Sequence, residues 1–347
     1  MTRSLRSFVP AIAISIAAGC IVAVLAGSLA ARYLNGEAAA PDSCLAVDNR
    51  PASPGAGMVL IPGGRFKMGS EDFRPEEAPV REAAVESFWI DSHDVTNAQF
   101  ARFVAETGYV TVSERAPPIA LNAQAVAPDI DRPVGLPGSW VFVQPSEIRN
   151  IDDIGQWWKF VAGANWRHPE GPDSDLNGRQ NHPVVHVAFQ DAEAYARWAG
   201  RMLPTEEQWE FAARGGRDGE IYVWNAEQDS DDKPQANHWR GIFPILNLGS
   251  RGYKSTSPVG CFPANGYGLY DIVGNVWQWT RSSWTPDLQS APTATPHELS
   301  YVIKGGSFLC APNFCMRYRP AARQPGDGTV GAQHIGFRTV LANAPSQ

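Results

Sequence analysis

The sequence predicts an α+β domain that is rich in loops and poor in regular secondary structure. Glycine (32) and proline (28) together account for 60 of the 347 residues, and both favour turns. Twelve tryptophans supply large rings that pack against irregular backbone. Helical periodicity is confined to three short segments, and no regular alternation of strands and helices predicts a parallel sheet.

The overall composition excludes two broad classes of protein. A hydrophobic fraction of 44% is enough for a sizeable core, which excludes a globally disordered chain. The formal net charge is −7, and an acidic chain is a poor binder of phosphate backbones. We therefore expect no nucleic-acid partner.

The N-terminus predicts an export signal. Residues 8–31 contain no charged side chain over 24 positions, which is long enough to span a bilayer. Arg3 and Arg6 precede this run and favour a cytoplasmic N-terminus. Residues 1–31 are therefore either a signal anchor in the inner membrane or a cleaved signal peptide. Both alternatives predict an extracytoplasmic domain on the periplasmic side, membrane-anchored or secreted.

The folded domain is expected over residues 58–341. Residues 32–57 are rich in Ala, Pro, Gly, Asp and Asn, which is typical of a linker. The first strands are expected at residues 58–62 and 85–90, where apolar residues cluster.

Two capping boxes predict helix starts. Thr96 and Gln99 have the spacing at which a side chain and the backbone cap each other, and Gly108 is placed to end that helix. Residues 205–208 repeat the capping pattern, and residues 191–200 form a further helical segment.

The remaining segments predict loops and short strands. Residues 116–150 carry six prolines and predict a long irregular loop. Residues 183–189 are rich in valine and predict a strand. After Gly215 the helical periodicity is gone, so short strands and loops are expected to the C-terminus.

Two of the five cysteines are spaced for a common site. Cys310 and Cys315 are separated by four residues, and Pro312 and Asn313 among them favour a turn. Outside the cytoplasm a disulfide is one interpretation. The other is a redox pair or a metal site, since thiolates select Cu(I) or zinc. Zinc normally takes four ligands, so a two-coordinate soft ion suits this pair better.

The other cysteines give weaker signals. Cys44 lies in the linker and has no partner that the sequence identifies, and Cys261 is expected to be a small buried filler. Arg317, Arg319 and Arg323 follow the cysteine pair, and their charges are expected to favour thiolate over thiol.

Two further groups are candidates for metal ligands. His182 and His186 are four residues apart, but the valines between them predict a strand, so we expect no metal role for this pair. Asp271 and Gln278 lie in a glycine-rich loop whose oxygens suit calcium. Such residues are also common turn-formers.

Nine short motifs follow one another along the predicted domain. They occupy residues 58–64, 94–103, 163–171, 182–186, 201–210, 266–270, 274–277, 305–310 and 336–338. In order and spacing they resemble the formylglycine-generating enzyme (sulfatase-modifying factor) family. The paired cysteines are the specific marker of the members that generate formylglycine.

The resemblance implies a fold, an activity and a set of site residues. The fold would be the family's α+β type, distantly like C-type lectins. The reaction would be the aerobic oxidation of a sulfatase cysteine, in a Cys-x-Pro-x-Arg-like segment, to Cα-formylglycine. Cys310 and Cys315 would hold Cu(I), with O₂ as co-substrate. Ser307 and Trp277 match an active-site serine and a tryptophan that lines the site.

The cysteine loop departs from the family pattern at two positions. Family members commonly carry His directly after the first cysteine and Tyr directly before the second. Here these residues are Ala311 and Phe314, so two polar groups beside the sulfurs are lost.

The family also binds two calcium ions, and the first site is altered here. Asn237 and the carbonyl groups of His238 and Tyr253 match its ligands. Arg251, however, stands where the family has a carboxylate, and a guanidinium there would repel Ca²⁺.

The second calcium site is matched more closely. Asp271, Gly274 and Val276 match its ligands, whereas Gln278 replaces a glutamate. Fewer carboxylates imply a weaker calcium affinity.

Three functions remain open from the sequence. The first is a divergent, copper-dependent formylglycine generator acting on a sulfatase polypeptide. The second is a paralogue that matures another extracytoplasmic protein or cofactor. The third is a non-catalytic lectin-like binding module, in which Cys310 and Cys315 form a plain disulfide. The fold alone does not choose between them, and no oligomeric state follows from the sequence.

Overall fold

The computed structural model describes residues 44, 55–116, 136–290 and 300–341. The chain divides into two units, residues 1–41 and 42–347, and the described residues all belong to the second. The expected division into residues 1–31, 32–57 and 58–341 stays a prediction. Within the described ranges, none of the helices has the length and apolar character needed to cross a bilayer. The span expected at residues 8–31 lies outside these ranges.

The helices are short, and two of them begin where the capping boxes predict. The α-helices of the described residues are α2 (Asn97–Thr107), α3 (Phe189–Trp198) and α4 (Glu206–Arg214), and the 3-10 turns are η1 (Pro75–Glu77), η2 (Val112–Glu114), η4 (Ile154–Gln156) and η5 (Ala226–Gln228). At α2 the Gln99 backbone N–H donates to Thr96 Oγ1 (3.2 Å), and Gln99 Oε1 accepts the Thr96 N–H (2.9 Å). Gly108 ends this helix with φ of 68°. Both predicted capping boxes are confirmed, since Thr205 and Gln208 cap α4 in the same way.

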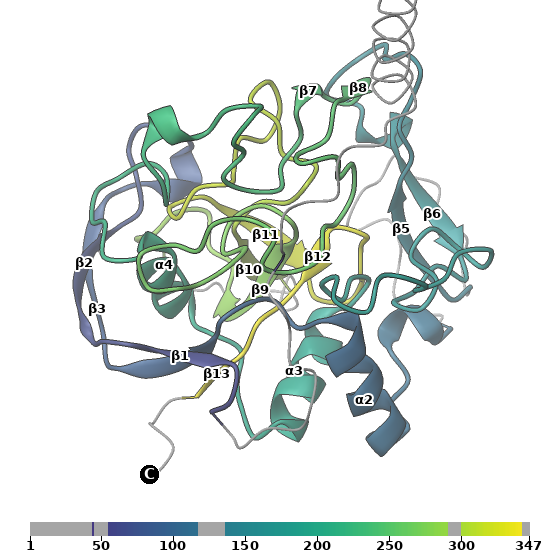
Figure 1. Ribbon diagram of the computed structural model, residues 1–347, viewed down its shortest axis with the longest axis horizontal. Coiled ribbons are helices and arrows are strands. Elements are labelled where there is room, and N and C mark those ends of the chain that lie inside the picture. Colours follow the sequence, from purple (N-terminus) through teal and green to yellow (C-terminus); the bar gives the residue numbers. More distant parts are fainter. Residues whose placement is uncertain (1–43, 45–54, 117–135, 291–299, 342–347) are drawn as a thin grey trace, which may run out of the picture. The chain divides into compact units, whose positions relative to one another are not determined.

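The strands form small, mostly antiparallel sheets (Figure 1). A central sheet has the order β11 (Arg323–Asp327), β10 (Ser300–Lys304), β9 (Trp277–Ser283) and β12 (Ile335–Gly336). A second has the order β1 (Met58–Ile61), β4 (Phe88–Asp91) and β13 (Val340–Leu341). Three pairs complete the set: β2 (Gly64–Met68) with β3 (Arg81–Val85), β5 (Gly138–Phe142) with β6 (Trp158–Ala162), and β7 (Gly241–Ile242) with β8 (Leu246–Asn247). The loop-rich α+β prediction is confirmed.

Three local predictions need correction. The strand expected at residues 183–189 is wrong, because Pro183 makes only an isolated bridge and His186 adopts φ of 60°, which interrupts an extended run. The loop expected at residues 116–150 contains β5, which pairs in register with β6; residues 117–135 lie outside the described part. The strand expected at residues 85–90 is divided between the ends of β3 and β4.

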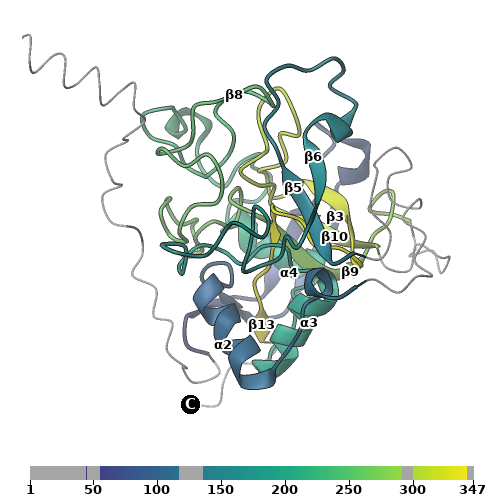
Figure 2. The same ribbon diagram turned by 90° about the vertical axis from the view of Figure 1, so that its right-hand side faces the viewer.

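Two apolar clusters form the core, and the smaller one supports the site. In the larger cluster α2 and α3 pack through Phe100, Phe103 and Tyr195, with Phe103 and Tyr195 ring centroids 5.6 Å apart. Figures 1 and 2 show these two helices side by side. The smaller cluster joins distant segments and consists of Trp157, Trp239, Phe243, Phe308, Leu309 and Ala311.

Candidate active site

A glycine turn places the serine and the first cysteine. Gly305 and Gly306 follow β10 with φ of 96° and 69°, a region that favours glycine. A Cβ on Gly306 would lie 2.8 Å from the backbone nitrogen of Tyr318, so the approach is too close for any other residue. The chain then turns, with the Cys310 N–H donating to the Ser307 carbonyl (2.9 Å).

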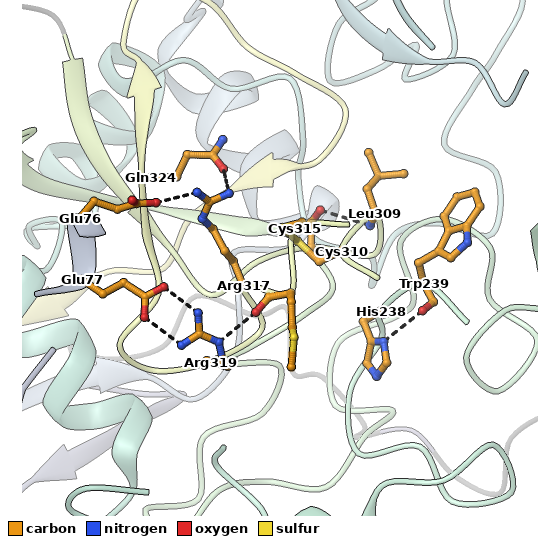
Figure 3. Close-up of a disulfide and its surroundings, with 12 residues drawn as sticks. Glu76, Glu77, His238, Trp239, Leu309, Cys310, Cys315, Arg317, Arg319 and Gln324 are labelled. Carbon is orange, nitrogen blue, oxygen red and sulfur yellow. Dashed lines mark hydrogen bonds and ion pairs between the residues drawn. A yellow bond between two sulfur atoms is a disulfide. The ribbon is translucent and has the colours of Figure 1, made fainter. Parts of the chain in front are cut away.

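The segment between the cysteines is a tight loop. Ala311 and Phe314 exchange backbone hydrogen bonds of 2.9 and 3.1 Å. Cys310 and Cys315 are joined by a disulfide, with their Cα atoms 5.1 Å apart (Figure 3). Cys310 is buried, whereas Cys315 is half-buried. The structure therefore holds the pair in its oxidised form, and a metal would require the reduced form.

The predicted site residues meet at one cavity of about 490 Å³. Trp277, Ser307, Cys310 and Cys315 all line it, although they come from β9 and from the loop after β10. The segment around the cysteines also supplies Leu309, Asn313, Phe314 and Arg317. Sequence reasoning missed the rest of the lining, which comprises Arg74, Ile151, Asp152, Ile154, Trp158, Phe243, Gln324 and His334. Their positions depend on contacts between distant segments, so no local motif announces them.

The wall beside the sulfurs is apolar and aromatic. Phe314 stacks on Phe243, with ring centroids 4.3 Å apart and an interplanar angle of 7°. Trp157 meets the edge of each ring. Ala311 is fully buried in the same cluster. The positions where the family carries His and Tyr are thus part of a dry wall, which limits water at the sulfurs.

His334 adds a neutral imidazole to this cavity. Its ring packs against Trp158, with centroids 4.7 Å apart. Burial lowers the pKa of His334 from 6.5 to about 3. Among the described residues, its buried Nδ1 has no hydrogen-bond partner. The sequence offered one signal for it, a histidine two residues before the closing motif at residues 336–338.

The arginines after the cysteine pair are bound to carboxylates. Arg319 makes two hydrogen bonds to Glu77, of 2.8 and 2.6 Å. Arg317 contacts Glu76 at 2.6 Å (Figure 3). Burial raises the pKa of Glu76, but the hydrogen bond from Arg317, a backbone hydrogen bond and the charges of Arg317 and Arg74 together outweigh it and leave this pKa below its usual value.

Arg323 is held in the same way. It donates to both carboxylate oxygens of Glu206, at 2.7 and 3.0 Å. The expectation that the charges of Arg317, Arg319 and Arg323 favour thiolate over thiol stays a prediction. Their charges are compensated by carboxylates, and the pairs fix the loop after Cys315 to η1 and α4.

At the first calcium position the carbonyls are engaged and the arginine is bound elsewhere. The His238 carbonyl accepts a hydrogen bond from Ser250 Oγ (2.7 Å). The Arg251 guanidinium donates to the Cys261 carbonyl, at φ of 50° for Arg251. Asn237 keeps one buried oxygen, Oδ1, without a partner in the described part of the chain. One orphaned oxygen next to an engaged carbonyl does not make a calcium site.

At the second position one carboxylate oxygen is available. Asp271 Oδ2 accepts the Gly260 N–H (2.6 Å), but Oδ1 is buried without a partner among the described residues. Gln278 is fully engaged, since its Oε1 accepts from Trp209 (2.7 Å) and Arg338 (2.8 Å). The orphaned Asp271 oxygen fits a cation, whereas the Gln278 oxygen is not free to bind one.

Two other sequence candidates lie outside this site. Both ring nitrogens of His186 are engaged, by Ser139 Oγ and the Pro169 carbonyl at 2.8 Å each. His182 contacts Thr256 Oγ1 at 2.9 Å. Over the described ranges, no group of three or more His, Cys, Asp or Glu side chains is arranged to hold a metal.

Cys44 and Cys261 form a second disulfide across 217 residues. The prediction that Cys261 is a simple buried filler is therefore wrong. The bond joins residue 44, in the predicted linker, to the segment around Arg251. Its partners are too far apart in the chain for spacing to reveal the pairing.

A family model now accounts for the motifs. Residues 45–343 match the sulfatase-modifying factor enzyme 1-like domain. The chain belongs to the sulfatase-modifying factor family. The Formylglycine-generating enzyme of Mycobacterium tuberculosis is 48% identical over 82% of this chain and 97% of that protein. The chain is thus an oxidoreductase of the formylglycine-generating type.

One further relative and one solved structure extend this comparison. The Inactive C-alpha-formylglycine-generating enzyme 2 of Mus musculus is 41% identical over 81% of this chain and 84% of that protein. Among solved structures, PvdO from Pseudomonas aeruginosa has a TM-score of 0.55 at 22% identity, covering 87% of this chain and 98% of its own. The last similarity shows the fold alone.

Proposed function

We propose that this chain is a copper-dependent formylglycine-generating enzyme that oxidises a sulfatase cysteine to Cα-formylglycine. The target cysteine would lie in a Cys-x-Pro-x-Arg-like segment, with O₂ as co-substrate. The observation that carries the proposal is the meeting of Trp277, Ser307, Cys310 and Cys315 at one cavity. The names of the most similar relatives support the reaction type.

The sulfur pair suits a soft monovalent metal. Once reduced, Cys310 and Cys315 offer two thiolates at a cavity wall, and such ligands select Cu(I) over hard cations. Among the described residues, no group of three or more His, Cys, Asp or Glu is arranged to hold a metal, so a coordination position would stay open for substrate. Bound copper would supply a Lewis-acidic centre for the substrate thiolate and O₂.

The chain's own residues prepare the cavity for this chemistry. Ser307 Oγ accepts the Leu309 N–H (3.2 Å), which leaves the hydroxyl hydrogen to donate into the cavity. Trp277 closes one side, and the Phe314–Phe243 stack keeps water from the sulfurs. Neutral His334 offers a hydrogen-bonding ring without adding charge.

The electron balance of the reaction requires a reductant in addition to the substrate and O₂. Converting the substrate CH₂–SH group to an aldehyde releases its sulfur as H₂S and removes two electrons. Reduction of O₂ to water takes four electrons, so a thiol reductant must supply the other two. The same class of reductant opens the Cys310–Cys315 disulfide.

Mass spectrometry of a Cys-x-Pro-x-Arg peptide tests the proposal. We expect the thiol-reduced, Cu(I)-loaded protein to convert the cysteine to an aldehyde in the presence of O₂, and the Cys310→Ser variant to leave it unchanged. If the Mycobacterium tuberculosis relative converts the same peptide and this protein does not, the proposal fails.

A non-catalytic binding module is the second candidate. The observation that favours it is the Cys310–Cys315 disulfide, because a closed disulfide cannot hold a metal. A relative that is 41% identical is named as inactive, which supports this alternative. A disulfide that resists mild thiol reductants in the folded protein would favour this candidate. A paralogue that matures another protein would instead keep copper binding but reject sulfatase peptides.

We also propose an extracytoplasmic location, with the domain on the periplasmic side. The uncharged run at residues 8–31 and the Cys44–Cys261 disulfide support it, since disulfides persist in oxidising compartments. Protease added to cells with a permeabilised outer barrier should digest the domain. Protection until the inner membrane is lysed would contradict the proposal.

A further inference from the structure

The β7–β8 hairpin exposes an unusual amount of apolar surface. Ile242 and Leu248 are each 60% exposed, Leu246 is 47% exposed and Ile245 is 38% exposed. Ile242 and Leu246 are direct cross-strand partners, so their side chains lie on one face. Contiguous apolar patches of this kind mark interaction sites on soluble domains.

The hairpin is attached directly to the cysteine loop. Its buried residue Phe243 lines the cavity and stacks on Phe314. Asn313, between the two cysteines, accepts the Phe243 N–H (3.3 Å) and donates to the Phe243 carbonyl (3.2 Å). Exposed Ile242 and Ile245 thus lie within two residues, along the chain, of a residue of the cavity wall.

Two neighbouring segments also expose apolar side chains. Gln144 Nε2 donates to the Ile245 carbonyl (2.5 Å), which joins the hairpin to the end of β5 (Figure 1). Val143 beside it is 47% exposed. Ile154, 41% exposed, also lines the cavity. Exposed apolar side chains therefore occur on the hairpin, on the segment bonded to it and in the cavity wall.

We infer that the β7–β8 hairpin docks an apolar segment of an unfolded polypeptide whose target cysteine enters the cavity. This inference rests on the proposed function and names the feature by which the substrate is recognised. The attachment of the hairpin to the cavity selects this occupant, because Phe243 lines the wall and residues flanking the target cysteine must leave past the segments that form it. An unfolded chain exposes apolar side chains that a folded protein buries. The hairpin would therefore favour a substrate before it folds.

Peptides with and without an apolar flank test the inference. One peptide holds only the Cys-x-Pro-x-Arg segment, and four others add about ten leucine-rich or serine-rich residues at either end. We expect the apolar flank, at one end, to raise affinity and lower KM about tenfold, the effect of burying one or two leucines. The serine-rich flanks should give no gain.

A matched pair of variants assigns the gain to the hairpin. Leu246→Ser combined with Leu248→Ser should remove the advantage of the apolar peptide over the minimal one. Leu60→Ser should keep it, because Leu60 is 48% exposed on β1 and does not line the cavity. All three side chains are exposed, so unfolding transitions should match the parent protein.

Binding measured by fluorescence anisotropy separates this inference from the proposed function. Affinity for the apolar peptide that depends on the hairpin, without turnover, would support docking while the copper chemistry fails. An equal advantage in the Leu246→Ser/Leu248→Ser variant overturns the inference. So does a loss of vesicle binding or of dimerisation in that variant with unchanged peptide affinity, since the hairpin would then serve a membrane or a second copy.

Discussion

The cysteine loop and the segment at residues 237–278 both depart from the family pattern. The substituted residues pack against apolar side chains in the loop, whereas they form hydrogen bonds in the other segment. In the loop, Ala311 and Phe314 replace polar residues and join an apolar cluster, while the backbone turn keeps its hydrogen bonds. In the other segment, Arg251 and Gln278 replace carboxylates and take up new hydrogen-bond partners. Apolar replacements at a cavity wall change its polarity, whereas charge changes among buried oxygens alter the bonding itself.

We therefore expect the cysteine loop to have kept copper binding and turnover, and the two calcium positions to have lost their calcium affinity. The four predicted site residues still line one cavity. The two calcium positions each keep one orphaned oxygen, on Asn237 and Asp271, without a full ligand set. The predictions below test each side of the contrast.

The largest effect is expected at the sulfurs. Cys310→Ser or Cys315→Ser should abolish turnover and copper binding, because thiolates are the soft ligands at this cavity. Both variants should still fold, since the turn is held by backbone bonds between Ala311 and Phe314. Copper titration with mass spectrometry of the peptide measures both. Unchanged copper stoichiometry in either variant would show that the pair is not the metal site.

The next effect concerns the pair that anchors the loop. Arg319 is 2% exposed, contacts the fully buried Glu77 and also donates to the Met316 carbonyl (2.9 Å). Arg319→Met should lower the free energy of unfolding by about 3–5 kcal/mol, because it leaves a buried carboxylate without its partner. Urea unfolding measures this.

An exposed ion pair serves as the control for the Arg319 variant. Arg102 and Glu106 lie one turn apart on α2 with side chains 34% and 46% exposed. Arg102→Met should cost less than about 1 kcal/mol. If the two substitutions cost the same, Arg319 does not anchor the loop.

Acid should destabilise the wall behind the cavity. His186 is fully buried and its backbone N–H donates to Ala332, two residues before His334. Burial lowers the pKa of His186 from 6.5 to about 4. The native state therefore holds this ring neutral while the unfolded chain takes up a proton. Its contribution is complete above pH 6.5 and is lost as the pH falls toward 4, by about 3 kcal/mol.

His186→Gln isolates this contribution. The amide can keep a hydrogen bond to Ser139 without titrating between pH 4 and 6.5. Unfolding free energies of both proteins across this range should converge as the pH falls. A constant difference at every pH would mean that His186 does not titrate between the two states.

The sequence predicted best what depends on neighbouring residues. The capping boxes at Thr96 and Thr205 are satisfied within one helical turn, so their spacing was sufficient. The site residues were found through motifs because Ser307 and Cys310 share one turn. The Cys44–Cys261 bond spans 217 residues, and no local pattern encodes it.

Other features depend on the fold as a whole. Residues 183–189 have strand-like composition, but the positive φ of His186 breaks the run, and only its environment explains that conformation. The partners of Arg317, Arg319 and Arg323 are carboxylates up to about 240 residues away in sequence. The cavity wall opposite the sulfurs, from Ile151 to Trp158, is likewise brought in by tertiary packing.

The smallest expected effect is a change in calcium affinity on substitution of Arg251. It tests directly whether the first calcium position has been lost. In the parent protein we expect no calcium binding at Asn237, His238 and Tyr253, because a guanidinium stands at the carboxylate position and repels a divalent cation. Arg251→Asp replaces that charge with a carboxylate, and Asn237 Oδ1 already lacks a partner among the described residues. Calorimetric titration should then show a gain in affinity of about tenfold or more, as each added carboxylate strengthens such sites.

Substitutions of Asn237 and Gln278 distinguish calcium binding at the first position from binding at the second. Asn237→Ala should abolish the gain produced by Arg251→Asp, because it removes the available side-chain oxygen of the first position. Gln278→Glu should instead strengthen the second position, where Asp271 Oδ1 already lacks a partner. If the parent protein binds calcium and Asn237→Ala removes this binding, the first position is still a calcium site. The expected difference between the cysteine loop and the calcium positions would then be wrong. This result would mean that the guanidinium, held by the Cys261 carbonyl, leaves the first position open and that the scaffold, like the cysteine loop, tolerates its substitution.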